Sequence, residues 1–275
     1  MTMNILKISK LFLFFLAVSC KEKSTSNDMT TSSSNKLKTE DISYNVDGKN
    51  YKSFVAYKEG SNEAKPVVMI LPEWWGLRDY AKDRAKQLAE LGYFAMAVDL
   101  YGDAKVVDNP TDAQKLTEPF YKIPVNAKMI FDGAKARILK FDNADYNKIA
   151  VIGYCFGGAQ ALNMARQESD LKGVVSFHGN LMTGIKPKNN KVPILVCNGA
   201  ADSFVSPEEI AAFKKQMDSS HVKYTFIDYP NAVHSFTNPA STEIGKKFNL
   251  KVAYNKEADE KSWNDMKVFL KDIFK

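Results

Sequence analysis

The sequence predicts one α/β domain, in which a mainly parallel sheet is covered by helices on both faces. From about residue 41 onward, short strand-like segments alternate with helix-like ones, an order typical of parallel sheets. The 275 residues, 45% hydrophobic and 25% charged, match the size and composition of a soluble domain with a sizeable core. No segment indicates a large additional cap domain.

The first 19 residues have the pattern of an export signal. Lys7 and Lys10 precede the apolar run 11–18, which leads into Cys20. The run is too short to span a bilayer comfortably, whereas a basic start and small residues before a cleavage position are typical of a signal peptide. Small residues before a cysteine resemble the lipobox of bacterial lipoproteins. That resemblance implies an exported lipoprotein, membrane-anchored by lipid on Cys20 and facing the periplasm or cell exterior; an ordinary signal with an incidental cysteine is the alternative.

Residues 20–40 are predicted to be a flexible polar tether, followed by the folded domain at 41–275. The segment 21–35 is rich in serine and threonine, so it cannot bury enough apolar surface to offset the entropy lost on ordering. Removal of the signal lowers the formal charge from +6 to +4, because two lysines and no acids are lost. This weak excess, without an arginine-rich run, gives no reason to expect a nucleic-acid partner.

The predicted strands start with a hairpin, 42–46 and 51–57, joined by a turn at Asp47-Gly48. Short apolar runs then predict buried central strands. They are 67–71, 94–98, 149–152, 173–177, 194–197 and 224–227. Apolar residues at three- and four-residue spacing predict helices between or after them. These helices cover 81–91, 129–140, 159–165 and 263–273.

The segment Gly153-Tyr154-Cys155-Phe156-Gly157-Gly158 lies between a predicted strand and a predicted helix. This is the context of a nucleophile elbow. Small flanking residues let the strand and the helix approach, and the sharp turn lifts the sulfur into the crevice at the carboxyl ends of the strands. The helix N-terminus also favours a thiolate. Cys155 is therefore the predicted nucleophile, with a buried cysteine in a glycine-rich turn as the alternative.

A base and an acid follow in the expected order. His234 comes after the last predicted strand, where a loop can bring the imidazole over Cys155. Asp202 comes after the strand 194–197 and would orient that imidazole. Nucleophile, acid and histidine in this order are typical of α/β-hydrolases. The alternatives are helix capping for Asp202 and a structural role for His234. A phosphate-binding Cys-x5-Arg loop is excluded, because Ala161 stands at the arginine position.

Two backbone amides are predicted to stabilise an oxyanion, those of Phe156 and Trp74. Trp75 and Tyr101, together with Trp74, are candidates for the apolar walls of the substrate pocket. His178, at the end of the strand 173–177, is a further candidate for lining the crevice. Its alternative is a structural histidine bonded to the backbone.

Glu73 stands beside two tryptophans, directly after a buried strand. This position indicates a carboxylate directed into an apolar site, where burial changes its proton affinity. The alternative is a solvated acid before the helix that opens at Asp79.

Five segments in this order resemble the dienelactone hydrolase family. They are 71–76, 98–102, 153–158, Asp202 and 234–236, and the resemblance runs from about Tyr44 to the C-terminus. It implies an α/β-hydrolase fold, a triad of Cys155, Asp202 and His234, and neither a metal nor an organic cofactor. It also implies that Glu73 accepts the thiol proton when substrate arrives, so that the free enzyme keeps a less reactive thiol.

The sequence departs from the family where substrate is held. Family members that act on dienelactone grip its carboxylate with two arginines, but the corresponding segments here are 102–105 and 237–239, without arginine. Lys105 offers only a point charge instead of a planar two-pronged anchor. Neutral esters or lactones are therefore expected at least as much as a small anionic lactone.

Together these features predict a hydrolase that cleaves small carboxylic esters or lactones through an acyl-enzyme on Cys155. One alternative is another enzyme class on the same scaffold, an acyltransferase or a peptidase. Another is a lipoprotein that binds a hydrophobic ligand without catalysis, a role that would not need the ordered triad. A monomer is compatible with each of these.

Overall fold

The computed structural model of the protein describes residues 36–60, 63–167, 170–187 and 191–275. The predicted signal peptide, Cys20 and the segment 21–35 lie outside these ranges. Among the residues that are described, no helix is long and apolar enough to cross a membrane.

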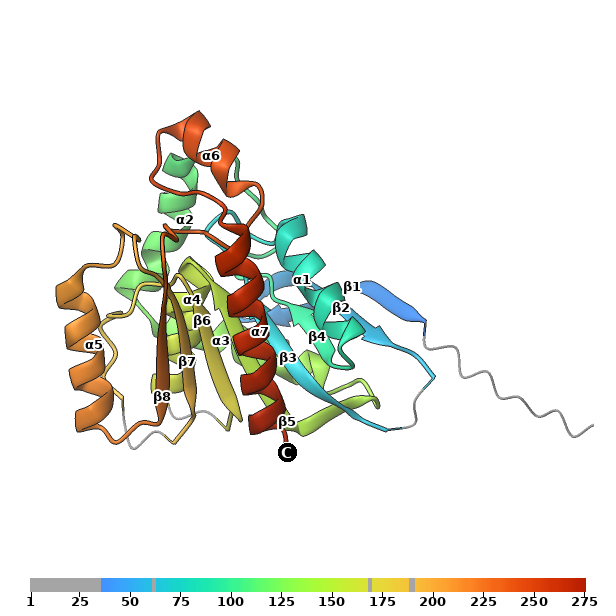
Figure 1. Ribbon diagram of the computed structural model, residues 1–275. Helices are drawn as coiled ribbons and strands as arrows, with labels where there is room; N and C mark the ends of the chain where they lie inside the picture. Colours follow the sequence, from blue (N-terminus) through green and yellow to red (C-terminus); the bar gives the residue numbers. More distant parts are fainter. Residues whose placement is uncertain (1–35, 61–62, 168–169, 188–190) are drawn as a thin grey trace, which may run out of the picture. The chain divides into compact units, whose positions relative to one another are not determined.

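The described chain contains one sheet of eight strands, in the order β1-β2-β4-β3-β5-β6-β7-β8 (Figure 1). Strands β3 to β8 run parallel, whereas β2 pairs antiparallel with β1 and β4. The predicted mainly parallel sheet is confirmed. The strands are β1 (Leu37–Val46), β2 (Lys49–Lys58), β3 (Lys65–Leu71), β4 (Phe94–Ala97), β5 (Ala144–Tyr154), β6 (Gly173–Phe177), β7 (Ile194–Gly199) and β8 (Tyr224–Tyr229).

Helices cover both faces of this sheet. Helices α1 and α7 enclose one hydrophobic core, and α3, α4 and α5 enclose the other. Helices α2 and α6 lie beyond one end of the strands (Figure 1). The helices are α1 (Asp79–Glu90), α2 (Pro110–Lys122), α3 (Val125–Ile138), α4 (Phe156–Arg166), α5 (Pro207–Ser219), α6 (Ser241–Phe248) and α7 (Lys256–Ile273).

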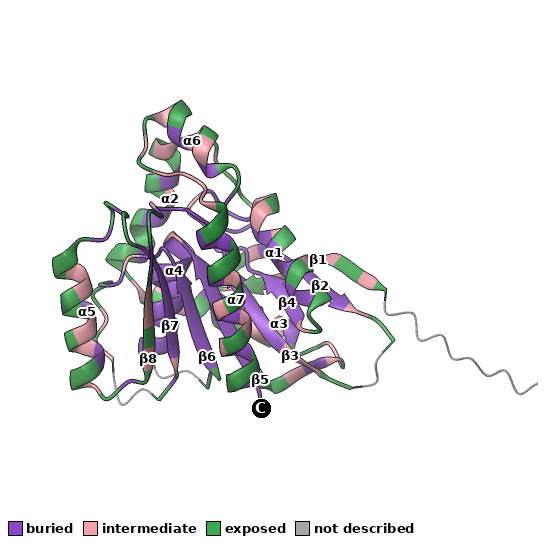
Figure 2. Ribbon diagram, viewed as in Figure 1, coloured by how far each residue is buried: buried purple, intermediate pink, exposed green. Residues whose placement is uncertain are grey.

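The central strands are apolar along their length because both of their faces are covered. In β3, Val67, Met69 and Leu71 belong to the core beneath α3 and α4, whereas Val68 and Ile70 belong to the core beneath α1 and α7. Successive side chains of a strand point to opposite faces, so one apolar run fills two cores. Figure 2 shows the result as buried central strands between helices whose outer sides are exposed.

The predicted strands and helices are present, with several boundaries moved outward. The expected end of the tether is wrong, because β1 begins at Leu37 and residues 37–40 pair with β2. Leu37 packs against a hydrophobic core, so this part of the chain gains apolar burial as well as strand pairing. Helices α2, α5 and α6 were not among the predicted ranges.

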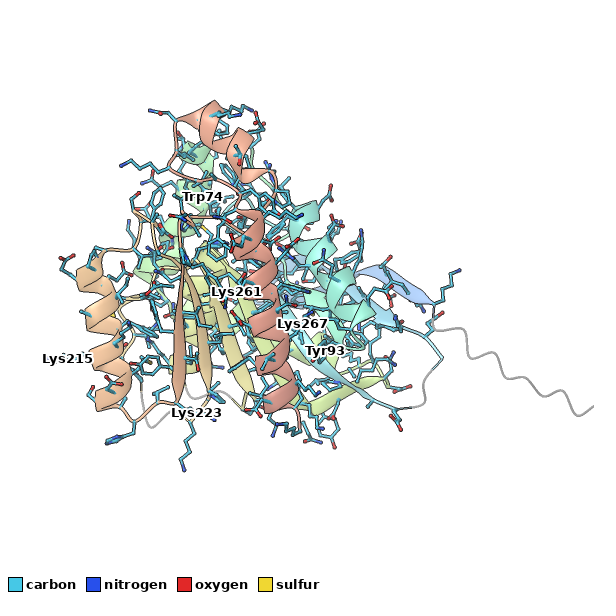
Figure 3. All side chains as sticks on the ribbon, viewed as in Figure 1. Trp74, Tyr93, Lys215, Lys223, Lys261 and Lys267 are labelled. Atoms are coloured by element: carbon cyan, nitrogen blue, oxygen red, sulfur yellow. The ribbon has the colours of Figure 1, made fainter. Side chains whose placement is uncertain are left out.

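The carboxyl ends of the parallel strands meet at one edge of the sheet, where α/β proteins build their sites. Figure 3 shows Trp74 at this edge, near α6, whereas Lys223, directly before β8, lies at the opposite edge. The edge carries the loop 72–76 after β3, Cys155 after β5, His178 after β6, Asp202 after β7 and His234 after β8.

Candidate active site

Cys155 lies on a strained turn between β5 and α4. Its backbone has φ of 54° and ψ of −117°, a conformation that is unusual for a residue other than glycine. The neighbouring glycines are required by close packing. A Cβ at Gly157 would lie 2.1 Å from the Leu71 carbonyl oxygen, and one at Gly153 would lie 2.0 Å from the Gly157 carbonyl oxygen. The elbow therefore depends on small residues on both sides of the cysteine.

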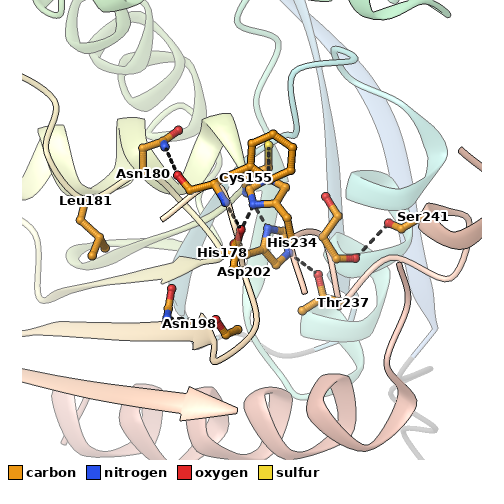
Figure 4. A network of polar contacts seen from close by, with 12 residues as sticks. Cys155, His178, Asn180, Leu181, Asn198, Asp202, His234, Thr237 and Ser241 are labelled. Atoms are coloured by element: carbon orange, nitrogen blue, oxygen red, sulfur yellow. Dashed lines mark hydrogen bonds and ion pairs between the residues drawn. The ribbon is translucent and has the colours of Figure 1, made fainter. Parts of the chain in front are cut away.

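The structure brings Cys155, His234 and Asp202 into one hydrogen-bonded chain (Figure 4). The Nε2 atom of His234 lies 3.1 Å from the Cys155 sulfur, and its Nδ1 atom lies 2.8 Å from Oδ2 of Asp202. The other oxygen of Asp202 accepts the Phe204 amide at 2.8 Å, which fixes the carboxylate. A nucleophile, an imidazole and an orienting acid thus stand in the arrangement that acyl transfer requires.

His234 is buried in this chain, between the Cys155 sulfur and the Asp202 carboxylate. Burial alone would lower its pKa, but the Cys155 sulfur and the hydrogen bond to Asp202 outweigh burial and raise the pKa of His234 to about 10. The imidazolium is therefore favoured as long as a thiolate faces it. Removal of the thiolate charge removes the largest of the effects that raise this pKa.

His178 lies directly beneath the nucleophile. Its Nδ1 atom accepts the Cys155 backbone amide at 3.1 Å, an amide that also donates to the Phe177 carbonyl at 2.9 Å. Its Nε2 atom lies 2.8 Å from Oγ1 of Thr237. Burial lowers the pKa of His178 well below its ordinary value of 6.5, and His234 adds to this shift. His178 is therefore neutral, and because Nδ1 accepts, Nε2 carries the proton and donates to Thr237.

This contact continues into a buried polar network. Tyr80 donates its hydroxyl to Oγ1 of Thr237 at 2.7 Å. Arg84 donates to the Thr237 carbonyl at 2.9 Å and forms an ion pair with Asp259. Thr237 belongs to the loop that carries His234. The network therefore connects the nucleophile elbow, the histidine loop and helices α1 and α7.

Glu73 is buried, but it does not line the cavity that contains Cys155. Its carboxylate accepts the Ser235 hydroxyl at 3.2 Å and the Asn238 side-chain amide at 2.7 Å. Burial raises the pKa of Glu73, and these two hydrogen bonds oppose the rise. Glu73 lines a neighbouring cavity, of which Trp75 also forms a wall. The structure thus attaches Glu73 to the histidine loop and not to the sulfur.

A cavity of about 600 Å³ opens beside Cys155 and His234, a size that suits a small-molecule ligand. Trp74 and Trp75 line it, as the sequence led us to expect, and so does Phe156, whose amide is a predicted oxyanion donor. The other lining residues come from α2, from the loops after β6, β7 and β8, and from α6 and the segment after it. They are Gln114, Thr117, Glu118, Tyr121, Lys122, Asn180, Phe204, Ser235, Ser241, Ile244, Leu250 and Val252.

Tyr101 and His178 do not line this cavity, contrary to our expectation. Asp99 accepts the Tyr101 amide at 2.9 Å and turns the loop so that the tyrosine ring is buried next to Phe156. The Tyr101 hydroxyl donates to the Trp74 carbonyl at 2.9 Å. Tyr101 therefore holds the loop of the predicted oxyanion donor from behind. His178 is withdrawn from the cavity by its bonds to the elbow and to Thr237.

The walls contributed by α2 and α6 were missed by the sequence analysis. A helix start was readable at Asn109-Pro110, because Asn109 accepts the Asp112 amide at 3.0 Å as an N-cap and proline suits the first helical position. No such signal indicated that Tyr121 or Ile244 would face Cys155. Within the described ranges, no group of three or more His, Cys, Asp or Glu residues is arranged to hold a metal ion.

Comparisons with known proteins find similar chains in several organisms. The chain is 29% identical over 183 residues to a Methylorubrum extorquens protein provisionally named as a carboxymethylenebutenolidase, and covers 63% of its length. It is 30% identical to protein usf of Aquifex pyrophilus, with 70% of this chain and 88% of that protein covered.

A solved relative from metagenomic libraries, described as a dienelactone hydrolase-like promiscuous phosphotriesterase, is 30% identical with a TM-score of 0.82. The match covers 87% of this chain and 99% of that one. The profile of the dienelactone hydrolase family matches residues 53–274. The chain therefore has the α/β-hydrolase fold and belongs to the dienelactone hydrolase family.

Proposed function

We propose that this protein hydrolyses carboxylic esters or lactones through an acyl-enzyme on Cys155. The observation that carries the proposal is the unbroken chain from the Cys155 sulfur through His234 to Asp202, at 3.1 Å and 2.8 Å. Cys155 and His234 also line a cavity. Non-catalytic ligand binding would need no such alignment. Membership in a hydrolase family supports the same reaction class.

The first half of the reaction forms a thioester. The Cys155 thiolate attacks the ester carbonyl carbon, and the amides of Phe156 and Trp74 stabilise the resulting oxyanion. As the tetrahedral intermediate collapses, the carbon–oxygen bond to the leaving group breaks, and the alcohol takes a proton from the His234 imidazolium. The acyl group is now on sulfur, and His234 is neutral.

The second half follows from the pKa of His234. The thiolate charge raises the pKa of His234, and acylation removes that charge. The pKa of His234 therefore falls, and the neutral imidazole can act as a base. It takes a proton from water, the hydroxide attacks the thioester, and the acid leaves. The thiolate and the imidazolium are restored, with Asp202 orienting the ring throughout.

Glu73 provides the activation step that the family resemblance implies. It accepts the thiol proton when substrate arrives, which leaves the thiolate facing the His234 imidazolium, and it returns this proton to the sulfur once the product acid has left. This step requires the carboxylate to leave Ser235 and Asn238, its partners in the structure. The raised pKa of Glu73 suits a group that has to hold a proton.

The proposal is tested with Cys155→Ala on a panel of small activated esters and lactones, with a phosphotriester included because of the solved relative. We expect loss of ester turnover and loss of the acyl-enzyme mass increase that wild type shows after rapid quenching. Cys197→Ala is the matched control, because Cys197 is buried in β7 away from the cavity, and it should keep both. Full ester turnover by Cys155→Ala would refute the proposal. Products trapped by added alcohols or amines would reveal an acyltransferase instead.

The N-terminal pattern supports a separate proposal, that the chain is exported and anchored by lipid on Cys20. Cys20→Ser should abolish the mass increase of the mature N-terminus and move the protein from the detergent phase to the aqueous phase. Unchanged partitioning and unchanged mass would contradict it.

A further inference from the structure

We propose that the active-site cavity selects uncharged esters with a hydrocarbon chain, and that this chain binds to a wall formed by Trp75, Ile244, Leu250 and Val252, here called the chain-binding wall. The inference rests on the proposed hydrolase function and adds the substrate class. Three features support it: the wall is connected to His234, the wall is rigidly packed, and the cavity has little positive charge to bind an anion.

The chain-binding wall is attached directly to the catalytic histidine. His234 and Val252 form a parallel β-bridge, and the Ala253 amide donates to the His234 carbonyl at 3.3 Å. All four wall residues line the same cavity as Cys155 and His234. A chain that leaves an ester carbonyl at Cys155 can therefore reach these apolar side chains within the same cavity.

The wall is also preformed. The Leu250 amide donates to the Gly245 carbonyl at 3.0 Å, and a Cβ at Gly245 would lie 2.4 Å from the Val252 carbonyl oxygen. Helix α6 is thus packed tightly onto the segment that follows it. Trp75 is 5% exposed and lies between the cavity and Arg78, whose guanidinium is 5.4 Å from the ring centroid. Binding of a chain requires little ordering of this wall.

The cavity offers little to a negative charge. Its lining residues include no arginine among those that the structure describes. Lys122 lines it, but its side chain is 70% exposed and its ammonium lies 2.5 Å from the Glu118 carboxylate on the same helix, so that solvent and this carboxylate screen its charge. Lys105 and Asn238, from the segments where dienelactone-cleaving relatives carry arginine, are not on the lining. An anionic ester would therefore lose hydration without gaining an unpaired cation.

The first test compares p-nitrophenyl esters from acetate to octanoate on the full-length chain, each corrected for uncatalysed hydrolysis. We expect kcat/KM to rise by up to about fourfold per methylene group until the wall is covered, as for burial of methylene groups in an apolar site. Mono-p-nitrophenyl adipate, which is the hexanoate ester with a terminal carboxylate, should react at least about tenfold more slowly than hexanoate. A flat chain-length series, or an adipate ester that reacts as fast as hexanoate, would overturn the inference.

The second test changes the charge of the wall. Ile244→Arg should lower the hexanoate-to-adipate ratio of kcat/KM by about tenfold or more, because it places an unpaired cation in the cavity. Val268→Arg is the matched control, since Val268 is 71% exposed on α7 and does not line the cavity, and its ratio should equal that of wild type. An unchanged ratio in Ile244→Arg would contradict the inference, as would an equal change in both variants.

Ile244→Ala keeps the test independent of how well the arginine variant folds. The loss of apolar surface should reduce the hexanoate-to-acetate ratio of kcat/KM, and an unchanged ratio would count against the chain-binding wall. The outcomes also separate the two proposals. If Cys155-dependent acetate turnover is absent, the proposed function fails. If acetate is cleaved but the series is flat, only the substrate class fails.

Discussion

His178 and His234 lie side by side at the carboxyl edge of the sheet, with ring centroids 5.3 Å apart, and their pKa values shift in opposite directions. Both rings are buried, and burial lowers the pKa of each. His234 faces a sulfur and a carboxylate, so its pKa rises to about 10. His178 faces a backbone amide and the Thr237 hydroxyl, and its pKa falls.

The difference shows that the partners, and not burial, decide what a buried histidine does in this site. In the mechanism that we propose, the charged ring exchanges protons with the leaving group and with water. The neutral ring of His178 accepts the backbone amide of Cys155. It also donates to Thr237, which belongs to the loop that carries His234. One histidine is assigned to chemistry and the other to its positioning.

The largest expected effect comes from removing the chemical histidine. His234→Asn should lower kcat for ester hydrolysis by roughly 10⁴-fold or more, because it removes the imidazole that contacts the sulfur and that activates water in the proposed mechanism. Steady-state and burst kinetics measure the loss, with circular dichroism to verify folding. A variant that retains a tenth of wild-type turnover would remove His234 from the mechanism.

Glu73→Gln tests whether Glu73, a third buried titratable group at this edge, takes part in the reaction as His234 does. Glutamine keeps the size of the side chain but cannot accept the thiol proton, so we expect a loss of about 10²-fold in kcat/KM. The rate of iodoacetamide alkylation with and without a substrate analogue gives a second readout. If turnover falls less than about fivefold, Glu73 only holds Ser235 and Asn238.

Replacement of the positioning histidine should cost far less. His178→Asn suits the positive φ of 41° at this position, and it weakens the bonds to the Cys155 amide and Thr237. A loss of about tenfold in kcat is expected, the equivalent of one misplaced hydrogen bond. The pH profile of kcat/KM should keep its wild-type shape, since His178 does not titrate in the reaction. A shifted profile would assign it a chemical role.

The smallest effect is on stability, and its sign differs between the two histidines. Below pH 6.5 the histidine is protonated in the unfolded chain but stays neutral in the folded one, because the pKa of His178 is lowered in the fold. The free energy of unfolding therefore decreases as the pH falls, by at most about 1.4 kcal/mol per pH unit. The raised pKa of His234 stabilises the fold fully below pH 6.5, and this contribution is lost as the pH rises towards about 10.

Urea unfolding between pH 5 and pH 10 separates the two contributions. His178→Asn should flatten the acid side of the stability curve and leave the alkaline side, and His234→Asn should do the reverse. Equal flattening on both sides in either variant would contradict the opposite pKa shifts.

The sequence predicted what depends on local chain geometry. Apolar runs covered on two faces gave the central strands, and a strand-to-helix turn with small neighbours identified Cys155. The order of Asp202 and His234 after later strands then placed three side chains at one edge, because parallel strands end together.

Predictions were less successful where side-chain direction depends on distant contacts. Asp99 turns Tyr101 inward by binding its amide, and Thr237 draws His178 away from the cavity. The roles of α2 and α6 as cavity walls arise only when segments more than 100 residues apart in the chain meet over Cys155. No periodicity in the sequence encodes that meeting.

The β-bridge between His234 and Val252 has a consequence for how this protein can change over time. The residue that helps to recognise substrate is a backbone neighbour of the residue that moves protons. Substitutions that widen or narrow the pocket at this point will also shift the imidazole. Substrate range and turnover cannot evolve independently there, so new preferences are expected to arise first at Ile244 or on α2, which carry no backbone bond to the histidine.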